Sequence, residues 1–388
     1  MRPWSQVGVS TLLLIVTLNL AAGLFPARSA AAEATDAARE VAAAPGDVAH
    51  AVKDVPDLPG GPFAPVVPDR HLVFPDDTGA HPDFRIEWWY ITGWLGDADG
   101  TERGFQLTFF RVGTGIGADN PSRFAPRHLI LAHAAIADPA SGRLRHAEAA
   151  ERALEPLAGA AIGRTHVWLR DWELRLEEEG YAARVATPDF TLDLRLVPPG
   201  PPVLNGLGGF SQKTPDPAAT SYYYSRPHLA VTGQLRLDGV DRPVSGRAWL
   251  DHEWSSELLS PEATGWDWIG INLHDGGSLM AFQMRHREGG ALWTAGTLVA
   301  PGGLPRALAP GEVRFRPGRL WRSPRTGKTY PVTWELAIAG ENWRLQPVMD
   351  DQELDGRRST GVVYWEGAVR LLAGEREIGR GYLEMTGY

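Results

Sequence analysis

The 388-residue chain contains no cysteine, and this absence excludes several kinds of protein. It can form no disulfide, so its folded state must be stabilised by the core alone. It also lacks the acceptor thiol that a lipoprotein anchor requires. Apolar residues make up 43% of the chain, which is enough for a sizeable core.

Positive charge is also scarce. The chain has 38 Lys and Arg against 47 Asp and Glu, a formal net charge of −9. An acidic surface of this kind argues against nucleic acid and anionic membranes as partners. After the N-terminal leader no apolar run is long enough to cross a bilayer, so the sequence does not predict an integral membrane protein.

Several catalytic motifs are missing. There is no Gly-x-Ser-x-Gly elbow, which disfavours an α/β-hydrolase. His252-Glu253 is not followed by a second His at the metalloprotease spacing, because Ser256 stands four residues after His252. No phosphate-binding loop or complete dinucleotide-binding fingerprint is present. The sequence therefore predicts neither a metal site nor a cofactor.

What the chain does have is turn residues and indoles: 44 Gly, 31 Pro and 15 Trp. From Phe74 onward it consists of short apolar and aromatic runs separated by turns. Ile86–Leu95 and Phe105–Val112, for example, flank an Asp- and Gly-rich turn, as in a β-hairpin. This spacing predicts an all-β sandwich or barrel rather than βαβ units.

The N-terminus reads as a secretory signal over residues 1–32. Arg2 is followed by an apolar stretch, Leu12–Leu24, and by small residues suited to cleavage. We therefore expect a periplasmic or secreted protein. Residues 33–69 are rich in Ala and Pro and are expected to be a disordered linker. Two domains are expected beyond it, at 70–250 and 251–388.

The segment that crosses this boundary, Trp249-Leu250-Asp251-His252-Glu253-Trp254, places an imidazole and two acids between tryptophans. On a strand, Leu250, His252 and Trp254 would share one face, and Trp249, Asp251 and Glu253 the other. His252 could transfer protons while Asp251 or Glu253 orients it or acts directly. A buried hydrogen-bond network that fixes the junction explains the same residues equally well.

Two further segments place a carboxylate beside indoles: Gly265-Trp266-Asp267-Trp268 and Glu87-Trp88-Trp89-Tyr90. Apolar walls raise the pKa of a carboxyl, which lets it donate a proton near neutral pH. Asp267 is thus a fourth catalytic candidate beside Asp251, His252 and Glu253. The expected ligand-binding side chains are Trp254, Trp266, Trp268, Glu87, Trp89 and Tyr223. Aromatic strand packing, with Asp267 satisfying turn amides, is the alternative.

Five segments in this order resemble the AttH-like family, which is related to carotenoid 1,2-hydratases. They are 87–93, 249–254, 265–268, Tyr364-Trp365-Glu366-Gly367-Ala368-Val369, and the C-terminal Gly379-Arg380-Gly381-Tyr382-Leu383-Glu384-Met385-Thr386-Gly387-Tyr388. The resemblance implies two tandem lipocalin-like antiparallel β-barrel domains. It also implies that His252 stands where hydratase proposals invoke a His, with Trp254 nearby.

The resemblance leaves two functions open. Relatives include cofactor-free hydratases that act on isoprenoid double bonds and fungal pericyclase-type enzymes, so the chain could be a hydro-lyase that adds water to a C=C bond. Other relatives are predicted secreted hydrolases or attachment-related proteins associated with ABC-type exporters. In that case the barrel would carry a lipid or isoprenoid without catalysis. Both readings imply an apolar small molecule as the ligand.

Overall fold

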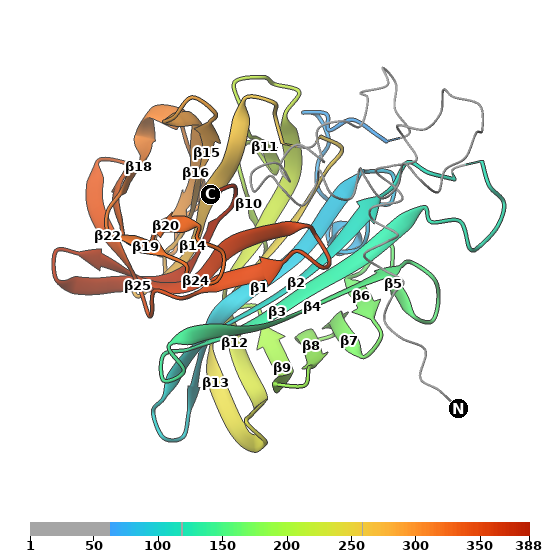
Figure 1. Cartoon of the computed structure of the whole chain (residues 1–388). Helices are drawn as coiled ribbons and strands as arrows, with labels where there is room; N and C mark the ends of the chain where they lie inside the picture. Colours follow the sequence, from blue (N-terminus) through green and yellow to red (C-terminus); the bar gives the residue numbers. More distant parts are fainter. Residues whose placement is uncertain (1–62, 118, 258) are drawn as a thin grey trace, which may run out of the picture.

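The structure is a computed structural model that describes residues 63–117, 119–257 and 259–388 (Figure 1). The predicted signal peptide and residues 33–62 of the predicted linker lie outside this part. The described chain is built from β-strands, with two short 3-10 helices, η3 (Asp76–Thr78) and η4 (Pro310–Glu312), which confirms the all-β prediction. Within these ranges no helix has the length and apolar character needed to cross a membrane.

The first sheet is antiparallel and forms a near-closed barrel. Its main strands follow the order β4-β3-β2-β1-β13-β12-β9-β8-β7-β6-β5, and β10 and β11 also pair with β12. Residues 153–157 connect the two edge strands directly, so the ends of the sheet approach one another. The strands are β1 (Ile86–Asp97), β2 (Glu102–Gly113), β3 (His128–Asp138), β4 (Arg143–Arg152), β5 (Ala158–Ala160), β6 (His166–Leu169), β7 (Trp172–Glu177), β8 (Gly180–Ala186), β9 (Phe190–Val197), β10 (Val203–Leu204), β11 (Phe210–Gln212), β12 (Thr220–Leu237) and β13 (Val240–Ser255).

The second sheet is also antiparallel and follows the order β17-β16-β15-β14-β25-β24-β22-β21-β18, with β23 paired to β24 and β19–β20 as a separate hairpin. Its strands are β14 (Ala263–Leu273), β15 (Ser278–His286), β16 (Ala291–Val299), β17 (Pro305–Leu308), β18 (Val313–Pro317), β21 (Trp334–Ile338), β22 (Glu341–Pro347), β23 (Glu353–Gly356), β24 (Val362–Ala373) and β25 (Arg376–Met385). The separate hairpin consists of β19 (Leu320–Arg322) and β20 (Thr329–Pro331).

The boundary between the two sheets differs slightly from the predicted division at residues 250 and 251. That division falls inside β13, which continues in the first sheet to Ser255. The next strand, β14, begins at Ala263 and belongs to the second sheet. The segment that carries Asp251 and His252 is therefore an inner strand of the first sheet rather than a connection between domains.

The end of the predicted linker, residues 63–69, packs against the first sheet. The amide of Ala64 donates to the carbonyl of Asp83 at 2.8 Å, and the amide of Val67 donates to the hydroxyl of Tyr222 at 2.9 Å. This segment leads into η3 and residues 79–85, which supply further side chains to the interior of the barrel.

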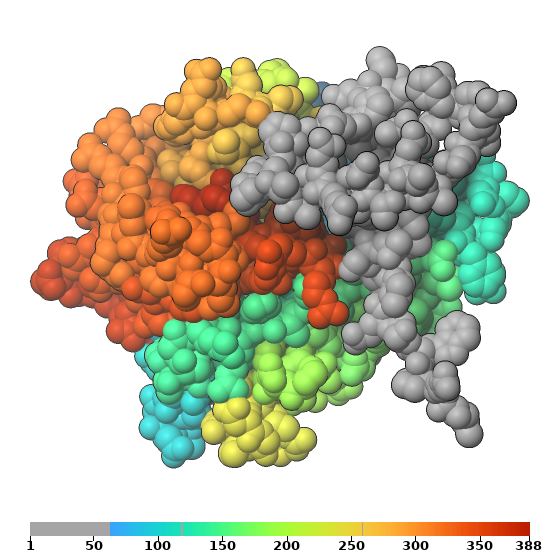
Figure 2. Space-filling view, viewed as in Figure 1, coloured from blue at the N-terminus to red at the C-terminus, as the bar shows by residue number. Residues whose placement is uncertain are grey.

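Apolar side chains are buried in three clusters, one inside each sheet and one between the sheets. The third cluster joins the outer face of β1, β12 and β13 to β14, β15, β24 and β25. The indole of Trp94 donates to the carbonyl of Gly381 across this boundary at 3.1 Å, and that of Trp268 donates to the hydroxyl of Tyr223 at 3.0 Å. Figure 2 shows the second sheet, in orange and red, lying directly against the first.

Candidate functional site

Strand β13 divides the predicted site residues between two environments. Its pairing with β1 places His252 opposite Trp89 and Trp254 opposite Glu87, and this face points into the first barrel. Asp251 lies on the other face, toward the second sheet, because its partner Tyr223 also contacts Trp268. The predicted separation of the two faces is confirmed. His252 and Asp251 therefore belong to different networks rather than to one catalytic pair.

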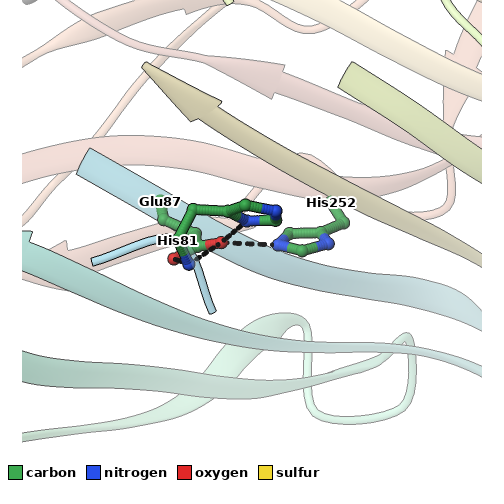
Figure 3. Close-up of side chains that lie close together, drawn as sticks. All are labelled: His81, Glu87 and His252. Atoms are coloured by element: carbon green, nitrogen blue, oxygen red, sulfur yellow. Dashed lines mark hydrogen bonds and ion pairs between the residues drawn. The ribbon is translucent and has the colours of Figure 1, made fainter. Parts of the chain in front are cut away.

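Inside the first barrel, His81, Glu87 and His252 converge (Figure 3). Oε1 of Glu87 lies 2.7 Å from Nδ1 of His81 and 2.9 Å from Nε2 of His252. Glu87 and His252 have no exposed surface, and His81 is 9% exposed. His81 lies in the segment just before β1, Glu87 lies on β1 and His252 lies on β13.

Each of the three side chains is held by a further partner. Asp77 lies 3.0 Å from Nε2 of His81, Tyr224 lies 3.1 Å from Nδ1 of His252, and Arg111 donates to Oε2 of Glu87 at 2.8 Å. Aromatic rings cover the cluster: Trp254 stacks on His81 at 3.7 Å and Trp89 on His252 at 4.7 Å between ring centroids. The cluster is thus fully connected and enclosed.

The protonation states follow from these partners. Burial lowers the pKa of His252 to about 4, against the effect of Glu87, so this ring is neutral and donates from Nε2. Burial also acts to lower the pKa of His81, but hydrogen bonds to Asp77 and Glu87 raise it overall. Burial opposes ionisation of Glu87, yet hydrogen bonds from both His residues hold its pKa well below the usual range. Glu87 is therefore ionised, and its negative charge is balanced by Arg111 and by protonation of His81.

Two His residues and a carboxylate are also a common ligand set for transition metals, with Zn²⁺ suited to this donor set. Arg111 argues for the hydrogen-bonded alternative, because it already neutralises Glu87 and would be repelled by a bound cation. The N–O distances of 2.7 and 2.9 Å are those of hydrogen bonds. The geometry favours a charge network that anchors residues 63–85 to the barrel.

On the other face of β13, Asp251 is 3% exposed and accepts hydrogen bonds only from neutral groups. Tyr223 donates at 2.7 Å, Ser225 at 2.5 Å and the indole of Trp249 at 2.7 Å. Among the described residues no ion pair to Asp251 is formed. Burial raises the pKa of Asp251 to about 7, although these three donors act in the opposite direction. The side chain is therefore a proton donor near neutral pH.

The other two predicted acids are paired with cations. Glu253 lies 2.6 Å from Nζ of Lys213, and Lys213 also rests on the rings of Tyr223 and Phe282. Asp267 is inside the second sheet, where Arg285 donates at 2.5 Å. Burial raises the pKa of Asp267 even against the charge of Arg285. Asp267 shares no hydrogen-bond partner with His252 among the described contacts, so the two do not form an acid–base pair.

The space between the sheets holds two carboxyls that the sequence reasoning did not select, Glu366 and Glu384. They lie directly opposite each other on β24 and β25. Tyr90 of the first sheet donates to Oε1 of Glu366. Both Glu residues lie within the fourth and fifth family-like segments, so those segments carried the signal. Glu366 follows Trp365 and so meets the same criterion, a carboxylate beside an indole, that selected Glu87 and Asp267.

The predicted ligand-binding side chains are split in the same way. Trp268 and Tyr223 are buried between the sheets, and Trp266 is half-buried at the same boundary. Glu87, Trp89 and Trp254 belong instead to the interior of the first barrel. A surface groove of about 200 Å³ opens at the boundary of the two sheets beside Trp94 and Arg370. The lining of this groove does not include Asp251 or Glu366. The inter-sheet space combines aromatic side chains with carboxyls, such as Asp251 and Glu366, that form no ion pair among the described residues.

Comparison with known proteins agrees with this architecture. The chain matches the family described as AttH-like over residues 65–388. The crystal structure of NE1406 from Nitrosomonas europaea, assigned to AttH, is 50% identical, with a TM-score of 0.79 over 84% of this chain and 100% of that chain. Kievitone hydratase from Nectria haematococca is 15% identical, with a TM-score of 0.63 over 84% of this chain and 98% of that chain, and so shares the fold. No curated protein matches. The chain belongs to the AttH-like family.

Proposed function

We propose that the protein binds an apolar alkene, an isoprenoid or a related lipid, between its two sheets and adds water to it or removes water from it. The observation that carries this proposal is Asp251, a buried carboxyl without a cationic partner in the described structure, surrounded by indoles and phenols. Its pKa of about 7 makes it a proton donor under ordinary conditions. The fold shared with a hydratase supports the same chemistry.

The proposed reaction begins with transfer of the Asp251 proton to one alkene carbon, which leaves a tertiary carbocation and the Asp251 carboxylate. The rings of Trp268 and Tyr90, which meet edge to face at 5.2 Å, would line the cation and stabilise it electrostatically. Water then attacks the cation, and a carboxylate of the same site takes the released proton. The net reaction is the addition of water to the alkene to give an alcohol. General acid–base assistance of this kind contributes about 10² to 10⁴-fold per group.

The wider context of this proposal follows from the sequence. The second sheet would act as the second lipocalin-like barrel of the family and cover the side of the site that faces away from the first sheet. The leader would direct the protein to the periplasm or outside the cell, where an ABC-type exporter is the expected partner for a lipid ligand. Detection of the cleaved protein in the periplasmic fraction, and its co-purification with such an exporter, would test these points.

One observation favours a second function, that of a non-catalytic lipid carrier. The acid and the imidazole that were expected to cooperate, Asp251 and His252, lie on opposite faces of β13. His252 is also fully hydrogen-bonded and enclosed. In a carrier, the indoles would form the wall of the lipid site and the carboxyls would only adjust its polarity.

The deciding experiment compares wild type, Asp251→Asn and Asp241→Asn with kievitone and with the acyclic isoprenoid lycopene, in water labelled with ¹⁸O. Asp241 is an exposed acid paired with Arg236 and serves as the matched control. We expect wild type and Asp241→Asn to incorporate ¹⁸O into an alcohol, and Asp251→Asn to be slower by about 100-fold or more. Retention of the probe on wild-type protein without labelled product would instead support the carrier.

A further inference from the structure

The inter-sheet space contains a second pair of acids, Glu366 on β24 and Glu384 on β25. The register of these strands places the two side chains directly opposite each other. Cross-strand neighbours project from the same face of a sheet. That face is the one toward the first sheet, because Tyr90 of β1 donates its hydroxyl hydrogen to Glu366. The two carboxyls therefore face the same space as Asp251.

Two carboxylates in this position cannot both be ionised without a large cost, since like charges opposite each other repel strongly when buried. Among the described residues, no Lys, Arg or His forms an ion pair with either one. Burial, and then the charge of Glu384, raise the pKa of Glu366 well above its usual value. Burial raises the pKa of Glu384 to about 8. The pair thus retains at least one proton at neutral pH.

The pair is also incompletely satisfied by the protein. Oε2 of Glu366 is buried and has no hydrogen-bond partner in the described part of the chain, and the same is true of the hydroxyl of Tyr382. Buried polar atoms in native proteins are nearly always paired, so such orphans point to a group that binds there. Glu366 has no exposed surface, whereas Glu384 is only half-buried. Glu384 is therefore the member of the pair that a ligand or water can reach.

We propose that Glu366 and Glu384, in the form that keeps one proton between them, make the second half of the catalytic site, facing Asp251 across a bound alkene. The inference rests on the proposed function and assigns the base that it leaves open. Tyr90 connects the two halves, because it stands opposite Asp251 in the pairing of β1 with β13 and binds Glu366. Glu384 would touch the substrate water, and Glu366 would hold the shared proton and position its neighbour.

The proton balance of the cycle then closes within the site. Asp251 gives its proton to the alkene carbon and becomes a carboxylate. The attacking water forms a C–O bond to the carbocation and loses one proton to Glu384 in those molecules in which this carboxyl is ionised, a form that increases as pH rises toward 8. That proton returns to Asp251 before the next turnover, so no oxidant, reductant or other co-reactant is needed. Elimination of water follows the same steps in reverse.

This arrangement specifies the stereochemistry of the reaction. Asp251 belongs to the first sheet and Glu384 to the second, so a planar alkene held between the sheets receives its proton from one side and its water from the other. Hydration in D₂O should therefore give the product of anti addition. Syn addition would show that the water is not activated from the second sheet and would overturn the role of Glu384.

A spectroscopic test needs no substrate. Infrared difference spectra of wild type against Glu366→Gln and Glu384→Gln, at about pH 7, report the C=O stretching band of protonated carboxyls. Asp251 contributes to this band in every variant. We expect the component from Glu366 to be lost in Glu366→Gln, and the band to be altered in Glu384→Gln. Glu377→Gln is the control, because Glu377 is already ionised by Arg380 and should leave the band unchanged. A spectrum showing both Glu366 and Glu384 ionised would refute the shared proton.

Kinetics with the probe that wild type turns over separate this inference from the proposed function. We expect Glu384→Gln to lower kcat by about 100- to 10,000-fold with little change in KM, and to remove the acidic limb of the pH profile, because a base must lose its proton before it can act. Turnover by wild type with full activity in Glu384→Gln would overturn the inference alone. Absence of turnover in wild type, with the protonated carboxyl still seen in the infrared, would leave the shared proton standing and overturn the proposed reaction.

Discussion

At the scale of the residue, the surroundings of one carboxyl on β13, that of Asp251, raise its pKa to about 7, with burial as the main cause. Asp251 has three neutral donors and no cation among the described residues, whereas Glu87 has Arg111 and two imidazoles. Both acids are buried, and burial alone would raise both pKa values. The pKa of Asp251 is raised, whereas hydrogen bonds and charges from the two His residues and Arg111 lower that of Glu87. Partners, and not burial alone, decide which acid can donate a proton.

The raised pKa of Asp251 predicts a specific pH dependence of stability. Between about pH 4 and 7 the native protein keeps a proton that the unfolded chain loses, so the free energy of unfolding falls as pH rises, by about 1.4 kcal/mol per pH unit from this group. Asp251→Asn removes this dependence. The free energy of unfolding, measured with urea, should decrease between about pH 5 and pH 8 in wild type. In the variant this decrease should be smaller by an amount on the order of 3 kcal/mol. Equal losses would contradict the assignment.

The cluster around Glu87 gives a second prediction at this scale. If Arg111 neutralises Glu87, Arg111→Met leaves a buried charge uncompensated and should lower the free energy of unfolding by about 3 to 5 kcal/mol. Arg357→Met, at a largely exposed ion pair, should change it by less than about 1 kcal/mol. Chelation with EDTA should leave Tm unchanged. Stoichiometric zinc in the purified protein, with a fall in Tm on chelation, would support a metal site instead.

At the scale of the element, the sequence was informative where apolar and aromatic runs are bounded by turns. The hairpin of β1 and β2 and the two faces of β13 were predicted from such runs and from the alternation of side chains along a strand. Strand β4 was missed because its sequence is charged and most of its residues are only half-buried. The partners of Asp251 and Glu87 could not be predicted, since they depend on pairing between strands far apart in sequence.

Glycines at close strand contacts test the register of the second sheet. A Cβ on Gly381 would lie 1.8 Å from the carbonyl oxygen of Gly270, in the pairing of β14 with β25 that positions Glu384. Gly381→Ala should therefore separate these strands and lower the free energy of unfolding by about 1 to 3 kcal/mol. Gly200→Ala is the control, because a Cβ there meets nothing within 4 Å. Equal Tm values for the two variants would argue against this register.

At the scale of the whole molecule, the proposed site exists only while the two sheets stay together. The outer face of the first sheet carries Tyr90, Trp249 and Asp251, and the facing side of the second carries Trp268 and the two Glu residues. Separation would expose this large aromatic surface to water, which costs roughly 25 cal/mol of free energy for each Å² of apolar area. We infer that the sheets fold and unfold as one unit, which also keeps Asp251 and Glu366 away from bulk water.

This cooperativity can be tested through another hydrogen-bonded contact between the two sheets. His133 of β3 is fully buried and bonds Tyr364 of β24 at 2.7 Å, while its other nitrogen lies 2.8 Å from Ser359. Tyr364→Phe removes one partner and should cost about 1 to 3 kcal/mol. Because the sheets are coupled, hydrogen exchange under mildly destabilising conditions should accelerate by the same factor in β7–β8 of the first sheet and in β21–β22 of the second. Acceleration confined to one sheet, or two separate calorimetric transitions, would show that the sheets unfold independently.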